Sequence, residues 1–88
     1  LDLDSAGSPH IAYWDNANDD LKYASWSGTQ WVIEVVDSPG NVGKYASMEL
    51  DSLGRPHIGY HDRDNGGVKY ATWDGTQWII EVVDGPVK

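Results

Sequence analysis

The sequence lacks cysteine and phenylalanine altogether, has a single methionine, and carries six basic residues against fourteen acidic ones. The lack of cysteine excludes disulfides, thiolate metal sites and cysteine nucleophiles, so these 88 residues need a source of stability other than cross-links. The net charge of −8 at pH 7 disfavours nucleic acid and anionic membranes as partners, because both repel an acidic chain at long range. No apolar run is long enough to span a bilayer. A cation or a neutral polar ligand suits this composition better.

An internal repeat dominates what the sequence does contain. Placing His10 over His57 sets residues 1–41 over residues 48–88 at an offset of 47, and 24 of these 41 pairs are identical. A repeat of this length predicts two copies of one supersecondary unit, as in solenoids, arrays and propellers. We therefore expect two units within one domain, at residues 1–41 and 42–88.

Each copy shows the alternation of apolar and polar residues that is typical of short β-strands. In the second copy we expect a first strand ending at Asp51, a turn, a second strand at His57–His61, a polar loop, and a hairpin over Tyr70–Val83. In the first copy only the end of the first strand is present, at residues 1–4. The repeating unit is therefore expected to be a four-stranded antiparallel sheet.

The hairpin of the second copy contains Asp74-Gly75, a dipeptide that favours a two-residue type I′ turn. With that loop, Trp73 lies opposite Thr76. Ala71 then lies opposite Trp78, and the two indoles are diagonal neighbours on one face of the hairpin. The first copy has the same hairpin with Ser-Gly at its tip. We expect the second tryptophan of each hairpin to be buried between sheets, at Trp31 and Trp78.

Apolar and aromatic residues occur on both faces of the expected sheets, so each sheet must be covered on both sides by further sheets. Such a sheet is the blade of a β-propeller. We therefore expect an all-β fold, a β-propeller with two four-stranded antiparallel blades per chain. Two blades cannot close a ring, so the ring is expected to be completed by homo-oligomerisation of about three or four chains, or by further blades of a longer chain.

Two repeated motifs carry a resemblance to a known group. Pro-His-Ile-(Ala/Gly)-Tyr-x-Asp and Lys-Tyr-Ala-x-Trp-x-Gly-x-x-Trp occur in both copies, and together they resemble the repeat of bacterial β-propellers of the sialidase and lectin types. The Gly-x-x-Trp segments also resemble the Asp-box turn of sialidases, although Trp26 and Trp73 stand where that motif has its aspartate. The resemblance implies a secreted or extracellular protein and a lectin-like, carbohydrate-binding role.

The loop between the second and third strands is expected to lie at one end of each sheet, together with the connection between the two copies. Trp14 and His61 occupy equivalent positions there, at a point where the two copies differ, and each is followed by an aspartate. An aromatic ring beside carboxylate acceptors suits a polyhydroxylated sugar. A glycan site is therefore expected at Trp14, Asp15, His61 and Asp62. Simple packing of Trp14 in the interface between sheets is the alternative.

The same loops are rich in the oxygen ligands that Ca²⁺ prefers. A calcium site would use Asp15, Asn18, Asp62 and Asp64. The spacing does not match an EF-hand loop, and Asp and Asn are also the ordinary residues of tight turns, so a purely structural loop is the competing interpretation.

No catalytic constellation can be assembled from this chain alone. Only Arg55 and Arg63 are available for the arginine cluster that the sialidase resemblance implies, and they are expected at opposite ends of the sheet. Glu34 and Glu81 have no partner carboxylate, and the repeated histidines His10 and His57 are expected to be packed and hydrogen-bonded. The sequence therefore predicts a non-enzymatic binding or scaffold module. The alternative is a piece of a secreted sialidase-like or other glycoside hydrolase whose catalytic residues lie outside this chain.

Overall fold

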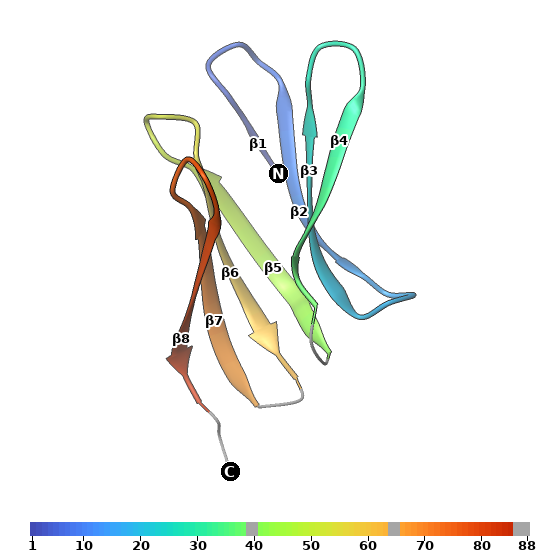
Figure 1. The fold of residues 1–88 in the computed structure, drawn as a ribbon, viewed down its shortest axis with the longest axis vertical. Helices are drawn as coiled ribbons and strands as arrows, with labels where there is room; N and C mark the ends of the chain where they lie inside the picture. The colour runs from blue at the N-terminus through green and yellow to red at the C-terminus, as the bar shows by residue number, and fades with distance from the viewer. Residues whose placement is uncertain (39–40, 64–65, 86–88) are drawn as a thin grey trace.

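The computed structural model describes residues 1–38, 41–63 and 66–85. The chain is all-β and forms two four-stranded antiparallel sheets, each a meander in chain order (Figure 1). The first sheet contains β1 (Asp2–Leu3), β2 (Pro9–Asp15), β3 (Asp20–Trp26) and β4 (Trp31–Asp37). The second contains β5 (Val42–Leu50), β6 (Pro56–Asp62), β7 (Gly67–Trp73) and β8 (Trp78–Asp84). The predicted all-β class and its four-stranded antiparallel sheets are confirmed. The described residues include no helix that is long and apolar enough to cross a membrane.

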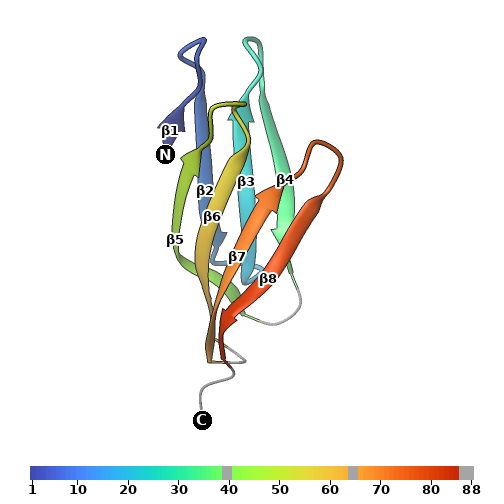
Figure 2. The same cartoon turned by 90° about the vertical axis from the view of Figure 1, so that its left-hand side faces the viewer.

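The two sheets lie face to face, with β5 of the second sheet against β2 and β3 of the first (Figure 2). Strand alternation places Leu21 and Tyr23 on the inner face of the first sheet, and Ile58 and Tyr60 on the inner face of the second. All four side chains are buried in one hydrophobic cluster. Val36, Val42, Met48 and Ala71 complete this buried cluster. The core of the chain is therefore the layer between the two sheets.

The connections fall at two ends of the molecule, as expected. The β1–β2, β3–β4, β5–β6 and β7–β8 turns lie at one end, which we call the turn end (Figure 1). The β2–β3 turn and the strand ends Asp37, Val42, Asp62 and Gly67 lie at the other, which we call the loop end. This arrangement follows from the meander, because successive antiparallel strands reverse direction.

The predicted two-residue turn at Asp74-Gly75 is wrong. The Asp74 carboxylate accepts hydrogen bonds from the backbone N–H groups of Thr76 and Gln77, at 2.8 and 2.9 Å, and so holds a four-residue loop. Trp73 consequently pairs directly with Trp78, and Ala71 pairs with Ile80 rather than with Trp78. The two indoles meet edge to face with their centroids 5.5 Å apart. The first copy has the same register, with Trp26 opposite Trp31.

The two repeated tryptophans differ in burial. Trp78 is half-buried against the core and meets Tyr23 of the first sheet edge to face, with centroids 5.4 Å apart. Trp31 is 45% exposed, so the expectation that it is buried between sheets is wrong for this chain. The reason is positional: Trp31 lies on the face of the first sheet that points away from the second sheet, so the second sheet does not cover it.

Candidate functional site

The four predicted ligand residues lie at the loop end, with Trp14 and Asp15 ending β2 and His61 and Asp62 ending β6. The start of β5 lies between the two aromatic members and contacts each of them separately. The Lys44 ammonium lies 4.9 Å from the centroid of the Trp14 ring, and Lys44 pairs with His61 in the β5–β6 register. Tyr45 meets the His61 ring at 6.1 Å. Trp14 and His61 therefore flank one irregular segment of β5.

Sequence reasoning missed Lys44 and Tyr45. The β5–β6 register shifts twice between Val42 and Ser47, and Tyr45 adopts a φ of 56°, which is unusual for an aromatic residue. This bulge turns the Tyr45 side chain outward, where it is 83% exposed. The one signal in the sequence was Gly43, because a glycine inside a strand often marks a bulge.

Asp15 is held by its own loop. Its carboxylate pairs with Lys22 at 2.7 Å and accepts hydrogen bonds from the Asn18 amide and the Ala17 N–H, each at 3.0 Å. These contacts, that of Lys22 first, lower the pKa of Asp15 from 3.8 to about 2. The Asp15 carboxylate therefore stays ionised, and its oxygen atoms are already engaged by the β2–β3 turn and by β3.

Asp62 belongs to a polar network that crosses between the sheets. Its side chain is 1% exposed and lies 3.1 Å from the Lys69 ammonium, which in turn lies 3.3 Å from Asp37 at the end of β4. The Tyr60 hydroxyl donates a hydrogen bond of 2.8 Å to the same Asp37 carboxylate. Burial, and then this hydrogen bond, raise the pKa of Tyr60. Burial alone would lower the pKa of Lys69, but its hydrogen bond to Asp62 and the charge of Asp37 raise it overall.

The four residues of the predicted calcium site are not brought together by the described part of the chain. Asp15 and Asn18 share the β2–β3 turn, whereas Asp62 ends β6 on the other sheet. Asp64 lies outside the described residues. Nowhere in residues 1–38, 41–63 and 66–85 do three His, Asp or Glu side chains converge as a metal ion would need. The Asp15 and Asp62 carboxylates are each paired with a lysine. Calcium binding stays a prediction.

His10 and His57 are hydrogen-bonded in the same way, as expected of packed histidines. His10 lies between Asp4, at 2.9 Å from Nε2, and the Tyr23 hydroxyl at Nδ1. The second copy repeats the arrangement with Asp51, His57 and Tyr70. The histidine hydrogen bond comes first among the causes that lower the pKa of Asp4 and of Asp51. This Asp–His–Tyr chain ties each β1–β2-type turn to the third strand of its sheet, which is a structural role.

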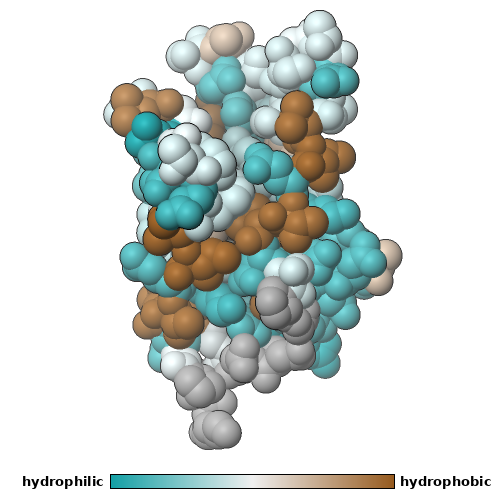
Figure 3. All heavy atoms as spheres, viewed as in Figure 1, coloured by the Kyte–Doolittle hydropathy of each residue, from teal (hydrophilic) through white to brown (hydrophobic). Residues whose placement is uncertain are grey.

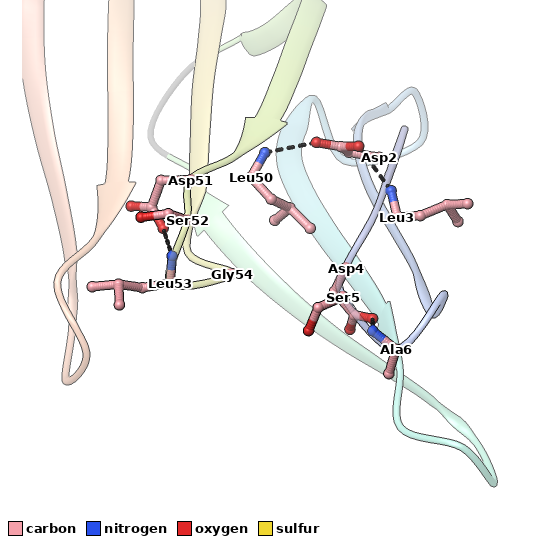
Figure 4. A pocket seen from close by; sticks show the side chains of 10 residues that line it. All are labelled: Asp2, Leu3, Asp4, Ser5, Ala6, Leu50, Asp51, Ser52, Leu53 and Gly54. Carbon is pink, nitrogen blue, oxygen red and sulfur yellow. Dashed lines mark hydrogen bonds between the residues drawn. The ribbon is translucent and has the colours of Figure 1, made fainter.

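A cavity of about 530 Å³ opens at the turn end, between the β1–β2 and β5–β6 turns (Figure 4). Asp2, Asp4 and Asp51 are the charged groups among its lining residues. Each of these carboxylates already serves the fold: Asp2 accepts a hydrogen bond of 2.9 Å from the Leu50 N–H across the two sheets, and the other two accept from the N–H groups of their own turns. The cavity is therefore lined by carboxylates whose hydrogen bonds shape the two turns and join the two sheets.

The Asp15 pairing predicts a distinctive acid titration. The pKa of Asp15 in the folded chain is below its unfolded value of 3.8, so the stability that the pairing contributes is present above that pH and is lost as the pH falls through about 2. Carboxyl-carbon NMR should show Asp15 titrating near pH 2. Lys22→Met keeps the aliphatic stem and should move the pKa back toward 3.8, while Lys44→Met, at the same end, should leave it unchanged. An Asp15 that titrates at its ordinary value in the unaltered chain would contradict the pairing.

Comparison of the chain with models of protein families, with curated proteins and with solved structures finds no match. The chain's own residues, and the equivalence of its two sheets, therefore carry the functional inference.

Proposed function

We propose that the chain is a non-enzymatic β-propeller module, whose two sheets act as blades and assemble with further copies into a closed ring. The loop end of that ring forms a binding or scaffold surface. One observation carries this proposal: several side chains that are buried on the covered face of one sheet have exposed equivalents on the uncovered face of the other, and this holds in both directions.

The first half of this pattern lies on the inner face of the first sheet. Leu21 and Val36 are 0% and 8% exposed there, because the second sheet covers them. Their repeat equivalents Val68 and Val83 are 42% and 65% exposed. The outer face of the second sheet therefore has the side chains of a covered face but no cover within the described residues.

The second half lies on the inner face of the second sheet. Met48 is 6% exposed and Trp78 is half-buried, because the first sheet covers them. Their equivalents on the outer face of the first sheet, Leu1 and Trp31, are 76% and 45% exposed. Hydrophobic groups accordingly reach the surface over β4 and β8 (Figure 3). The outer face of the second sheet is thus equivalent to the inner face of the first, and the outer face of the first is equivalent to the inner face of the second. These two inner faces pack against each other within the chain.

Covering these faces favours head-to-tail association. Each uncovered face exposes several large aliphatic side chains, and burial stabilises by about 25 cal/mol for each Å² of apolar surface removed from water. The outer face of the second sheet is matched to the outer face of the first, so the contact is heterologous, and the proposed ring requires that the rotation from one copy to the next closes. A ring of about three or four chains has about six or eight blades, which are common propeller sizes.

The binding surface of this proposed ring is the loop end around the β5 bulge. Tyr45 is exposed there beside His61, and the Lys44 ammonium lies over the ring of Trp14, whose Nε1 is buried. This chemistry suits a polyhydroxylated ligand such as a glycan. Tyr45 supports the proposal most directly, because residues held at unusual backbone angles cluster at functional sites.

The assembly is tested by the mass of the chain in solution. Light scattering coupled to size exclusion should give one discrete species of about three or four times the chain mass of 9.7 kDa. A monodisperse monomer with its own cooperative unfolding transition would contradict the proposal, because the uncovered faces would then be stable in water.

The binding surface is tested on a glycan array with the assembled protein. Tyr45→Ala should lower the signal of any bound glycan by about tenfold, which corresponds to the loss of one aromatic contact, and should leave the fold intact because the side chain is exposed. Leu53→Ala, an exposed residue of the turn end, is the matched control and should change nothing. A blank array for the assembled, unaltered protein would remove the glycan part of the proposal.

A further inference from the structure

The internal contact between the sheets includes one polar anchor. The Asp37 carboxylate, at the end of β4, accepts a hydrogen bond from the Tyr60 hydroxyl at 2.8 Å and pairs with the Lys69 ammonium at 3.3 Å. Asp37 belongs to the first sheet, whereas Tyr60 and Lys69 belong to the second. Asp37 is 8% exposed, so the anchor is closed off from solvent. It joins the outermost strand of one sheet to two middle strands of the next.

Each part of this anchor has a repeat equivalent that lies on an uncovered face. At the repeat offset of 47, the residue equivalent to Asp37 is Asp84, the one equivalent to Tyr60 is Tyr13, and the one equivalent to Lys69 is Lys22. Tyr13 and Lys22 pair with one another across β2 and β3, and Tyr60 and Lys69 do the same across β6 and β7. Asp84 is exposed at the end of β8.

The receiving half of a second anchor is already built in the first sheet. Lys22 pairs with Asp15 at 2.7 Å, just as Lys69 pairs with the equivalent Asp62 at 3.1 Å. In the described ranges, no group accepts a hydrogen bond from the Tyr13 hydroxyl, and none pairs with the Asp84 carboxylate. Tyr13 and Lys22 lack only the carboxylate that Asp37 provides to Tyr60 and Lys69. In the complete anchor this carboxylate comes from the end of the outermost strand of the neighbouring sheet.

We propose that the Asp84 carboxylate of one copy supplies that group, accepting a hydrogen bond from Tyr13 and pairing with Lys22 of the next copy. The uncovered face of the first sheet is therefore covered by a second copy of this chain, whose second sheet packs against it. This inference rests on the proposed ring and adds to it the contact that sets its direction and register.

Two further equivalences agree with the same docking. Trp78 meets Tyr23 of the first sheet inside the chain, and the docking places Trp31 of one copy on Tyr70 of the preceding copy. Ala12 packs against the core, whereas the space beside its equivalent Gly59 is open, with no atom within 4 Å of a Cβ built there. The next copy would fill this space.

A double-mutant cycle between copies tests the contact. The concentration at which the assembly half-dissociates is measured by sedimentation for the unaltered chain, Asp84→Ala, Tyr13→Phe and the double variant. Asp84→Ala should raise that concentration at least about tenfold, because a hydrogen bond to a charged group is lost. Tyr13→Phe should raise it less. The double variant should match Asp84→Ala within about twofold, because Tyr13 acts through Asp84.

Asp74→Asn is the matched control. It removes one negative charge at the tip of the same β7–β8 hairpin and keeps the acceptor oxygen that holds the turn, so it should assemble like the unaltered chain. An assembly that forms normally with Asp84→Ala, or effects of the two substitutions that simply add, would overturn the contact and leave the ring standing. An unaltered chain that stays monomeric at every concentration would overturn both.

Discussion

A sheet with apolar side chains on both faces needs a cover on both faces, and the rest of this structure depends on that constraint. Inside the chain the two sheets cover one face each, and the residues between them form the buried cluster. The remaining two faces expose aliphatic side chains such as Val83 and Ile33. In the proposed ring, the two sheets being copies of one unit, those faces cover one another, and the constraint that forms the core also holds the copies together.

Apolar burial is not directional, so other groups must set how one sheet sits on the next. Asp37, Tyr60 and Lys69 do this within the chain, since one carboxylate must meet both a hydroxyl and an ammonium. Removing one member would leave a buried polar group without its partner, which costs more than the bond itself contributes. The network therefore favours one register of the two sheets over others.

The elements that depend on local signals could be predicted from the sequence. Alternation gave the strands, and the repeat gave the two equivalent sheets and their two ends. The hairpin register could not be predicted, because it depends on which N–H groups the Asp74 side chain reaches. Asp37 contacts Tyr60 and Lys69, which lie on the other sheet and follow it in the sequence by 23 and 32 positions. No local sequence pattern marks such contacts. At the candidate site, Trp14 and His61 could be singled out, but Tyr45 depends on a bulge that only the folded strand shows.

In the proposed ring, the outer face of the first sheet becomes an inner face when copies associate, and the environment of Trp31 reports this change most directly. The chain can be labelled with 5-fluorotryptophan and the Trp31 resonance assigned by its loss in Trp31→Phe. The change in its ¹⁹F shift between H₂O and D₂O should be large in dilute solution, where Trp31 is 45% exposed, and should fall toward that of Trp78 as copies assemble. A Trp31 resonance that stays fully sensitive to solvent in the assembled protein would contradict the account.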